Sequence, residues 1–380
     1  MPAVKLGDVA VEARELYKGD KTGCPIVGLE HITPEEVTLS NWSIDTENTF
    51  TKMFRKDDML FGRRRAYLRK AAIAPFDGIC SGDITVIRAK SDKMLPMLLP
   101  FVIQNEDFFE YAVGKSAGSL SPRVKWEHLK NYTFNLPSLE KQKELADLLW
   151  SIHDSRKAYQ DLLRETDELI KAQFIEMFGD PEENPMGWPI RKLSEVAKVD
   201  GTMTKEYEKY AEYPHIGIDS IEKNTGILSG YRTVREDNII SPKYHFGPQH
   251  ILYSKIRPAL NKVAIPEFEG LCSADCYPLL PIGGWCERKF LAHVLRSDFF
   301  LNYILSYSGR SQMPKVNRKQ LGGFTFPCPP MELQNRFLIL TEQSDKSKFE
   351  LKQAIKSVDN LVRSLVQKEL KFTVEDSGEI

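Results

Sequence analysis

The chain has no excess of charge of either sign. Its 380 residues include 52 Lys and Arg against 53 Asp and Glu, which gives a formal net charge of −1 at pH 7. A bulk basic excess, which identifies many nucleic-acid-binding proteins, is therefore missing. This does not exclude a nucleic-acid partner, because steering of a charged ligand depends on where the charges sit and not on their sum.

Long apolar runs and cysteines are also scarce. The most apolar stretch, residues 94–103, is interrupted by Pro96 and Pro100, whereas a membrane helix needs about 18 consecutive apolar residues. The first eight residues contain no apolar segment of a secretory signal. Six cysteines in a chain of this length do not make a disulfide framework. We therefore expect a cytoplasmic protein with reduced cysteines and no membrane partner.

Familiar catalytic and metal-binding motifs are missing as well. The sequence has no phosphate loop of Walker type and no G-x-G-x-x-G pattern. Residues 184–187 (Asn-Pro-Met-Gly) do not match the Asn/Asp-Pro-Pro-aromatic element of an adenine methyltransferase. Cys272, Cys276 and Cys286 are irregularly spaced, which favours buried thiols over a zinc site. We expect neither a catalytic nor a metal-binding residue on this chain.

An internal duplication organises the chain. Residues 60–83 align with residues 252–275 without a gap, at an offset of 192, and eleven of the 24 positions are identical. Chance would give roughly one or two identities in such a window, so the two segments are copies of one unit. The identical pairs are Leu60/Leu252, Arg65/Arg257, Leu68/Leu260, Lys70/Lys262, Ala72/Ala264, Ile73/Ile265, Phe76/Phe268, Gly78/Gly270, Cys80/Cys272, Ser81/Ser273 and Asp83/Asp275.

The correspondence extends to both sides of this window. The Asp-Phe-Phe triplet at 107–109 aligns with the triplet at 298–300, and Leu129 to Gln142 align with Leu321 to Gln334. A period of half the chain is far longer than that of a solenoid. At roughly 150 residues per domain, a chain of this length holds two or three domains, and the repeat predicts two large copies.

The first part of each copy, about 1–136 and 188–329, mixes short apolar runs with Gly, Pro and Asn. We expect strands at 68–73, 84–87, 263–265 and 277–280. We expect helices at 95–113 and 290–307, although prolines lie at the start of the former. This pattern predicts a mixed α/β (α+β) fold.

The second part of each copy predicts one long helix, over 138–178 and again after Pro330. Helices of about 35 residues would be about 50 Å long. Each apolar stripe could pack on its own globular part, but a stripe of this length would overhang a small domain. We therefore expect the two helices to pair as an antiparallel coiled coil. The stripes contain Leu145, Leu149, Ile152, Tyr159, Leu163, Ile170, Phe174 and Met177, then Leu333, Phe337, Leu340, Ile355, Val358, Leu361, Leu365 and Leu370.

Local charge is distributed unevenly. Residues 52–70 hold eight basic and two acidic residues, residues 309–319 hold four basic and no acidic ones, and residues 138–183 hold six basic and twelve acidic ones. A charge run is usually only a solvated face. Here Arg63, Arg64 and Arg65 are followed by Tyr67, and such residues in loops commonly contact phosphates and base edges. The globular parts are therefore the expected DNA-facing regions.

The chain resembles the specificity (S) subunit of type I restriction–modification systems over nearly its whole length. The motif at the end of the first long helix, residues 178–193 (FGDPEENPMGWPIRKL), is similar to that family, as is the segment that begins this helix, residues 136–142 (LPSLEKQ). The two G-x-C-S-x-D elements, at 78–83 and 270–275, are also typical of it.

This resemblance implies two target-recognition domains, residues 1–137 and 188–329, each followed by a spacer helix, 138–179 and 330–372. Residues 180–187 would form a linker and residues 373–380 an acidic disordered tail. The chain would be a non-catalytic subunit that reads a bipartite sequence in double-stranded DNA. Two adenine-N6 methyltransferase (M) subunits that bind S-adenosylmethionine would dock on it, and ATP-dependent restriction/motor (R) subunits would complete the complex, with no cofactor on this chain.

Basic and polar residues at equivalent places in the two copies are the candidate DNA contacts. A spacer of 50 Å corresponds to about 15 base pairs, so both domains could reach one duplex. The candidates are Arg63, Arg64, Arg65, Tyr67, Arg69, Lys70 and Ser119 in the first copy, and Lys255, Arg257, Asn261, Lys262, Ser308, Gly309, Arg310, Ser311, Gln312 and Lys315 in the second.

Two other classes of function stay open at this point. The chain could be a stand-alone nuclease or methyltransferase with an unrecognised site, which would modify DNA unaided. It could also be a protein–protein adaptor whose coiled coil is the binding surface, which would fail to bind DNA even with methyltransferase subunits present.

Overall fold

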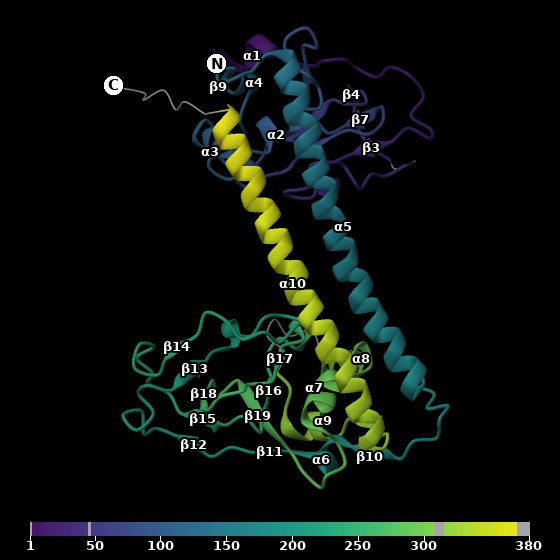
Figure 1. The fold of residues 1–380 in the computed structure, drawn as a ribbon, viewed down its shortest axis with the longest axis vertical. Coiled ribbons are helices and arrows are strands. Elements are labelled where there is room, and N and C mark those ends of the chain that lie inside the picture. Colours follow the sequence, from purple (N-terminus) through teal and green to yellow (C-terminus); the bar gives the residue numbers. More distant parts are fainter. Residues whose placement is uncertain (1, 45–46, 308–314, 371–380) are drawn as a thin grey trace. The chain divides into compact units, whose positions relative to one another are not determined.

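The computed structural model describes residues 2–44, 47–307 and 315–370. The chain forms two compact units (Figure 1): unit 1 contains residues 1–162 and 351–380, and unit 2 contains residues 163–350. Each of two 40-residue helices, α5 (Leu139–Phe178) and α10 (Met331–Leu370), contributes one portion to each unit.

Unit 1 is built on two small sheets and a strand pair. An antiparallel four-stranded sheet has the order β2-β8-β5-β6, a three-stranded sheet has the order β3-β7-β4, and β1 pairs with β9. The strands are β1 (Ala3–Lys5), β2 (Ala10–Glu12), β3 (Ile26–Val27), β4 (Lys52–Phe54), β5 (Met59–Gly62), β6 (Ala71–Ile73), β7 (Gly78–Cys80), β8 (Ile84–Ala89) and β9 (Thr133–Asn135). The helices and 3₁₀ turns are α1 (Leu6–Val9), η1 (Leu29–His31), η2 (Ala66–Leu68), α2 (Leu99–Ile103), α3 (Glu106–Gly114) and α4 (Trp126–Leu129).

Unit 2 repeats this plan and adds strands β12 and β14 at the edges of the second sheet. Its sheets have the orders β11-β19-β16-β17 and β12-β15-β18-β13-β14, and β10 pairs with β20. The strands are β10 (Ile190–Lys192), β11 (Ala197–Val199), β12 (Met203–Thr204), β13 (Pro214–Ile216), β14 (Arg232–Thr233), β15 (Lys243–Phe246), β16 (Ile251–Ser254), β17 (Val263–Ala264), β18 (Gly270–Cys272), β19 (Cys276–Pro281) and β20 (Thr325–Pro327). The helices and turns are α6 (Leu193–Val196), η3 (Ile218–Ser220), η4 (Pro258–Leu260), α7 (Arg288–Arg296), α8 (Asp298–Leu305) and α9 (Arg318–Gly322).

The two units share strand register, which confirms the repeat. Met59 pairs with Ile87 in unit 1, and Ile251, 192 residues later, pairs with Leu279 in unit 2. The parallel pairing of β3 with β7 is repeated by β13 with β18. The mixed α/β fold with an internal repeat is therefore as the sequence predicts.

The aromatic core corrects one detail of the predicted alignment. The Phe108 ring meets the Phe61 ring edge-to-face at 5.6 Å, and the Phe300 ring meets the Tyr253 ring in the same way at 5.7 Å. Phe108 therefore corresponds to Phe300, at the offset of 192. The match of the Asp-Phe-Phe triplets at 107–109 and 298–300, at an offset of 191, was wrong by one residue.

Two predicted helices are each two helices. Residues 95–113 contain α2 and α3, and residues 290–307 fall in α7 and α8. The break lies at Asn105 in unit 1 and at Ser297 in unit 2, where each side chain accepts a hydrogen bond from a backbone N–H at the start of the next helix. Such a residue begins a new helix, so these two predictions were wrong.

The predicted strand at 68–73 is shorter than expected. Leu68 ends the 3₁₀ turn η2, and Arg69 has a φ of 52°, in the left-handed region, so the strand β6 begins only at Ala71. A left-handed residue cannot continue an extended strand.

The portions of α5 and α10 that lie in one unit pack against each other. In unit 1, Arg156 of α5 forms an ion pair with Asp359 of α10 at 2.6 Å. In unit 2, Lys348 of α10 pairs with Asp167 of α5 at 3.0 Å. Residue numbers rise along α5 while those of their partners fall along α10, so the two helices run antiparallel, as expected.

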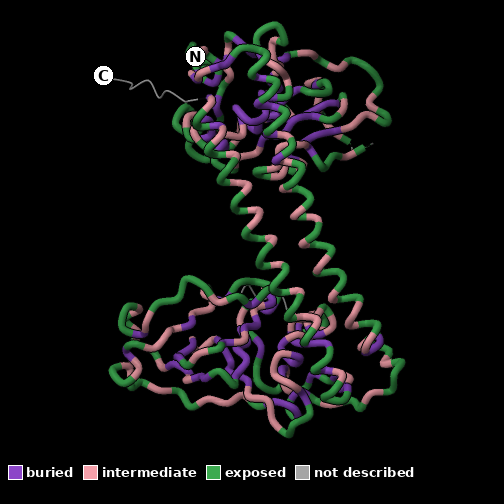
Figure 2. The backbone as a smooth tube through the Cα atoms, viewed as in Figure 1, coloured by how far each residue is buried: buried purple, intermediate pink, exposed green. Residues whose placement is uncertain are grey.

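Buried residues are concentrated around the strands and short helices, while the long helices carry mostly intermediate and exposed residues (Figure 2). In unit 2, Phe178 at the end of α5 contacts the rings of Phe290 (5.3 Å) and Phe337 (5.5 Å). In unit 1, the buried core includes Leu145 and Leu149 of α5. The long helices are therefore anchored in the cores at their ends.

Each long helix begins with a buried glutamine that ties it to the domain. Gln142 donates to the carbonyl oxygens of Lys93 (3.0 Å) and Pro137 (2.9 Å) and accepts from the N–H of Leu95 (2.9 Å). All three bonds recur in unit 2, where Gln334 donates to the carbonyl oxygens of Trp285 (3.0 Å) and Pro329 (2.8 Å) and accepts from the N–H of Glu287 (2.8 Å).

Candidate nucleic-acid interface

Equivalent turns carry most of the predicted DNA contacts. The turn η2 joins β5 to β6, and η4 joins β16 to β17. Both turns are flanked by left-handed residues, Arg65 (φ 54°) and Arg69 (φ 52°) in unit 1, Arg257 (φ 48°) and Asn261 (φ 46°) in unit 2. Left-handed backbone is costly for residues other than glycine. Its presence at the same two positions in each unit shows that the two units hold these turns in one shape.

Two of the predicted contacts hold the fold together. The amine of Lys70 donates to the carbonyl oxygen of Leu29 at 2.6 Å, and the amine of Lys262 donates to that of Ile218 at 2.8 Å. Leu29 and Ile218 each begin a 3₁₀ turn, η1 and η3. These bonds account for the identity of the two lysines in the repeat, and their contact with DNA stays a prediction.

The G-x-C-S-x-D elements place one carboxylate in each unit. A Cβ atom on Gly78 or Gly270 would lie 2.6 Å from a backbone carbonyl oxygen, so only glycine fits. Cys80 and Cys272 are buried core residues. The hydroxyl oxygens of the two serines, Ser81 and Ser273, accept the N–H of Asp83 and of Asp275, each at 3.2 Å.

Each of these carboxylates is shared by basic residues. Asp83 pairs with Arg123 (2.8 Å) and Arg64 (3.4 Å). The hydrogen bond from Arg123 holds the pKa of the Asp83 carboxyl below its usual range. In unit 2, Asp275 lies 3.6 Å from both Lys255 and Lys315. Because Arg123 and Lys315 are 192 residues apart and both join a backbone bridge next to the turn, they are equivalent.

Sequence reasoning missed Arg123. Lys315 was predicted to face DNA, and the offset of 192 leads from it directly to Arg123. The signal was present, but it lay outside the gapless window in which the repeat is most obvious.

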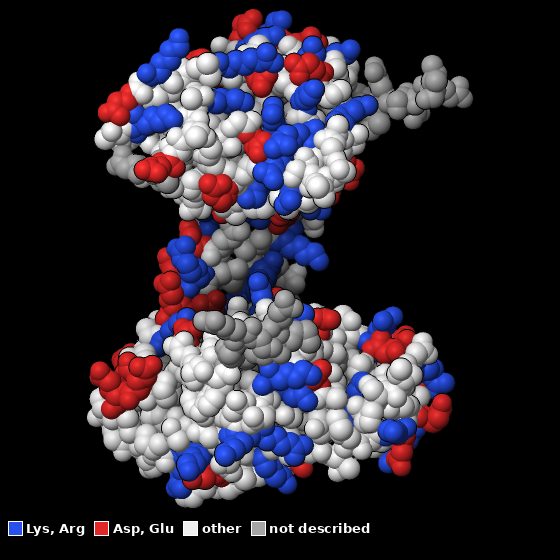
Figure 3. Space-filling view, turned by 180° about the vertical axis from the view of Figure 1, so that it is seen from behind, with Lys and Arg blue, Asp and Glu red and all other residues white. Residues whose placement is uncertain are grey.

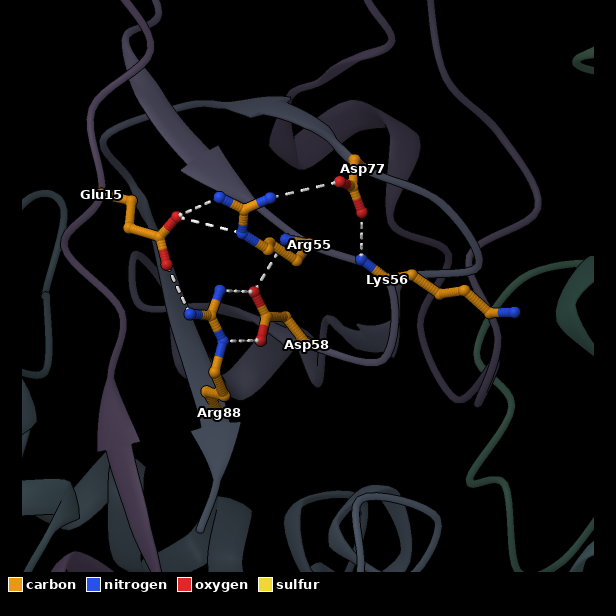
Figure 4. A network of polar contacts seen from close by, with 6 residues as sticks. All are labelled: Glu15, Arg55, Lys56, Asp58, Asp77 and Arg88. Carbon is orange, nitrogen blue, oxygen red and sulfur yellow. Dashed lines mark hydrogen bonds and ion pairs between the residues drawn. The ribbon is translucent and has the colours of Figure 1, made fainter. Parts of the chain in front are cut away.

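The basic run at residues 52–70 is less positive in space than in sequence (Figure 4). Arg55 pairs with Glu15 (3.0 Å) and with Asp77 (3.6 Å). The neighbouring Arg88 forms two bonds of 2.7 Å with the buried Asp58 and also pairs with Glu15. Acidic residues far away in sequence therefore neutralise part of this run.

Three further basic residues of this run are also engaged. Arg69 pairs with Glu106 at 2.7 Å. Lys52 donates to the carbonyl oxygen of Ile84 at 2.7 Å, and burial lowers the pKa of its amine. Arg64 shares the carboxylate of Asp83, described above. The predicted balance of +6 thus does not translate into six solvent-facing charges.

Besides the exposed Lys56, the basic and aromatic side chains of this run that have no ion-pair, hydrogen-bond or ring partner among the described residues are Arg63, Arg65 and Tyr67. In the described part of the chain, Arg65 has no ion-pair partner and is exposed. Tyr67 is 55% exposed. The Nε of Arg63 is buried and has no hydrogen-bond partner among the described residues. These three residues, at the end of β5 and on η2, are the core of the candidate surface of unit 1.

Unit 2 places a cluster of cations and aromatic rings at the corresponding positions. The amine of Lys255 lies 5.2 Å from the centre of the Tyr277 ring, and the guanidinium of Arg318 lies 5.9 Å from the same ring. Arg318 also donates to the Tyr244 hydroxyl at 3.2 Å. The counterparts in unit 1, at the offset of 192, are Arg63 for Lys255, Thr85 for Tyr277, Trp126 for Arg318 and Lys52 for Tyr244.

The remaining candidates fall into three groups. Asn261 is buried and donates to the carbonyl oxygen of Arg296 at 2.7 Å, so its amide is already engaged. Ser119 lies in an exposed loop, and Lys315 is exposed and lies 3.6 Å from Asp275. Ser308, Gly309, Arg310, Ser311 and Gln312 lie outside the described residues.

Lys and Arg gather in patches on both units, with acidic residues among them and wider uncharged areas between (Figure 3). Across the described residues, no group of three or more His, Cys, Asp or Glu side chains could hold a metal ion. In the same residues, no helix combines the length and apolar character that crossing a membrane requires. Five of the six cysteines are buried and all are free.

Comparisons with known proteins agree with this arrangement. A relative from Escherichia coli, the type I restriction enzyme EcoDI specificity subunit, is 32% identical over 188 residues, which is 48% of this chain and 41% of the relative. The chain thus matches about two fifths of that relative's length. Among solved structures, the S subunit of a type I restriction–modification system from M. genitalium has a TM-score of 0.57 at 13% identity, covering 96% of this chain and 95% of that one.

A chain from a structure concerned with assembly of a type I restriction–modification system has a TM-score of 0.54 at 19% identity, and covers 97% of each chain. At these identities the structural matches show a shared fold. The profile of the type I restriction modification DNA specificity domain matches residues 3–159 and again residues 185–358. Two copies of that domain cover most of the sequence, and the chain belongs to the type I restriction–modification DNA specificity family.

Proposed function

We propose that this chain supplies the DNA sequence specificity of a type I restriction–modification complex, and that each unit reads one half of a bipartite target. The observation that carries the proposal is the pair of equivalent surfaces around Arg63 and Lys255. One backbone frame presents a basic residue at the same position, while neighbouring side chains differ between the units. Two half-sites of different sequence require such differences, since bases are read by particular side chains.

The chemistry of the candidates supports a division of roles. Lysine is a point charge suited to phosphates, while the planar fork of arginine matches the edge of guanine. Arg63 and Arg65 are the arginines next to the turn η2 that have no ion-pair partner among the described residues. We therefore assign base contact to these two arginines and phosphate contact to Lys255 and Lys315.

The long helices are proposed to dock the partners and to set the spacing of the half-sites. In unit 1 and in unit 2, the portions of α5 and α10 carry large apolar side chains that are exposed in this chain. Such exposure is expected of a surface that another protein covers. We propose that two adenine-N6 methyltransferase subunits bind here and carry S-adenosylmethionine, and that ATP-dependent restriction/motor subunits join them. The chain itself would be non-catalytic, without a cofactor, and act in the cytoplasm. The exposed side chains are Leu139, Leu148, Leu162 and Leu361 in unit 1 and Leu169, Ile175, Met331, Ile339 and Phe349 in unit 2.

The test of DNA contact replaces Arg63, Arg64 and Arg65 by alanine in the complex with methyltransferase subunits. Binding to target duplex should weaken by about 1–3 kcal/mol for each lost arginine–base contact, and discrimination against a scrambled duplex should fall. Arg55→Ala is the matched control, because its guanidinium is already paired with Glu15 and Asp77. Unchanged binding by the triple variant would remove this surface from the proposal.

A genetic experiment tests the function as a whole. Sequencing of modified adenines in cells with and without this gene should show a split motif that disappears on deletion. Methylation or cleavage by the purified chain alone would instead favour a stand-alone enzyme. Failure to bind any DNA with methyltransferase subunits present would favour a coiled-coil adaptor.

A further inference from the structure

Unit 2 has an open hollow of about 650 Å³ beside α9 that carries a concentrated positive charge. Lys192, Arg318 and Lys319 line it, and no carboxylate is among its lining residues. Neither Lys192 nor Lys319 has an ion-pair partner in the described part of the chain. Like charges kept together without a counter-charge repel one another, so this arrangement favours an anionic ligand.

The polar groups around these cations are fixed in place by hydrogen bonds. The Tyr303 hydroxyl donates to the carbonyl oxygen of Gln320 at 2.9 Å. Asn317 and Gln320 bond each other's backbone N–H, both at 2.9 Å, which holds the start of α9. Hydroxyl and amide groups that are already ordered lose little entropy when a ligand binds between them.

The hollow is continuous with the candidate DNA surface of unit 2. Arg318 lines it and also lies over the Tyr277 ring and donates to Tyr244. Lys255 shares that ring. A DNA strand that contacts Lys255 would therefore pass close to the hollow.

Unit 1 does not reproduce this charge. The counterpart of Lys319 is Glu127, which pairs with Arg14 at 3.3 Å, and the counterpart of Arg318 is Trp126. The positive hollow is thus a property of unit 2 and not of the repeated frame.

From these observations we infer that the hollow binds a phosphodiester group of the DNA backbone next to the half-site read by unit 2. This inference rests on the proposed function. Lys192 and Lys319 supply charge, and Arg318 joins the hollow to the cations around the Tyr277 ring. The side-chain amide N–H groups of Asn317 and Gln320, whose oxygens hold the start of α9, supply the hydrogen bonds. Because a phosphate carries no sequence information, the site adds affinity and register without changing the target.

The test compares two double variants in the complex with methyltransferase subunits: Lys192→Gln with Lys319→Gln, and Lys192→Arg with Lys319→Arg. Affinity is measured for a target duplex and for a scrambled duplex. The salt concentration runs from about 50 to about 300 mM, the range over which counterion release changes affinity strongly. We expect the Gln variant to lose about tenfold in affinity for both duplexes and about two in salt slope, and the Arg variant to keep both.

The outcomes separate this inference from the proposed function. If wild-type complex binds no DNA, the proposed function fails. If wild type binds and the Gln variant keeps its salt slope, or the Arg variant loses it, the phosphate site is wrong. A loss of affinity for the target duplex alone would also overturn it. So would a result in which inorganic pyrophosphate binds the complex but does not weaken DNA binding. Unfolding in urea should be unchanged in both variants, since neither lysine has a protein partner in the described residues.

Discussion

Unit 1 and unit 2 differ in the groups that surround their shared carboxylate. In unit 1, Asp83 binds two arginines, one at 2.8 Å, within a surface rich in ion pairs. In unit 2, Asp275 lies 3.6 Å from two lysines, beside the Tyr277 ring over which Arg318 also lies. The backbone around both is the same. Duplication has therefore kept the contacts that position the surface and changed those that face outward.

The strongest test of the shared frame removes the buried glutamines. Gln142→Leu or Gln334→Leu would leave two carbonyl oxygens and one N–H without partners, and each change should cost about 2–4 kcal/mol of stability. Urea unfolding of the two variants measures this cost. Gln343→Leu, on the exposed face of α10, is the control and should change stability by less than about 0.5 kcal/mol. A large difference between the stability costs of Gln142→Leu and Gln334→Leu would show that the two units do not share this joint.

The lysines that bond to backbone carbonyls come next. Lys70→Met and Lys262→Met keep the aliphatic stem but lose the amine, so each should lower stability by about 1–2 kcal/mol. Thermal unfolding gives the size of the effect, and DNA affinity at matched stability separates the two roles. If stability is untouched while affinity falls, the carbonyl contact is incidental and the predicted DNA role gains weight.

The Asp83 carboxylate should make the stability of unit 1 sensitive to acid. The folded pKa of Asp83 is depressed by Arg123, so its contribution to stability is complete above its unfolded pKa of about 4 and is lost as pH falls through the lower folded value. Asp83→Asn should therefore lower stability at neutral pH by about 1 kcal/mol or less, because the side chain is partly exposed, and should flatten the decline in acid. Denaturant unfolding between pH 2 and 7 (about the range spanned by carboxyl titration) measures both effects. At neutral pH, Asp275→Asn should lower stability by less than Asp83→Asn, because its contacts are longer, and the reverse order would contradict this expectation.

The smallest expected effects are those of the two serines. Ser81→Ala and Ser273→Ala each remove one hydrogen bond to the backbone N–H of the following aspartate, which should cost about 0.5–1 kcal/mol in either unit. Differential scanning calorimetry of both variants tests the equality. Because the bond lengths are the same, unequal losses would show that the loops differ in ways their contacts do not reveal.

Much of the fold could be predicted because it is encoded in local patterns that occur twice. The apolar stripes predicted the two long helices, and identities such as Gly78 with Gly270 predicted the repeat. The helix breaks at Asn105 and Ser297 were not predicted, because a single polar residue within an apolar run is a weak signal for the start of a new helix.

The candidate surface was predicted less well than the fold. Its basic residues were found from their clustering, but their partners are far away in sequence: Arg69 pairs with Glu106 and Arg55 with Glu15. Charge counted along the chain cannot include such partners, because they meet only after the sheets have formed. The hollow beside α9 depends in the same way on tertiary contacts, whereas Arg123 could have been found from the offset of 192.

The hydrogen bonds of the buried glutamines determine which neighbouring side chains can be replaced by mutation. All their hydrogen bonds go to backbone atoms, so the joint does not depend on which side chains its neighbours carry. Lys93 in one unit and Trp285 in the other offer the same carbonyl oxygen. Side chains around a joint of this kind are free to drift while the helix stays in register, which lets new surfaces evolve without rebuilding the molecule.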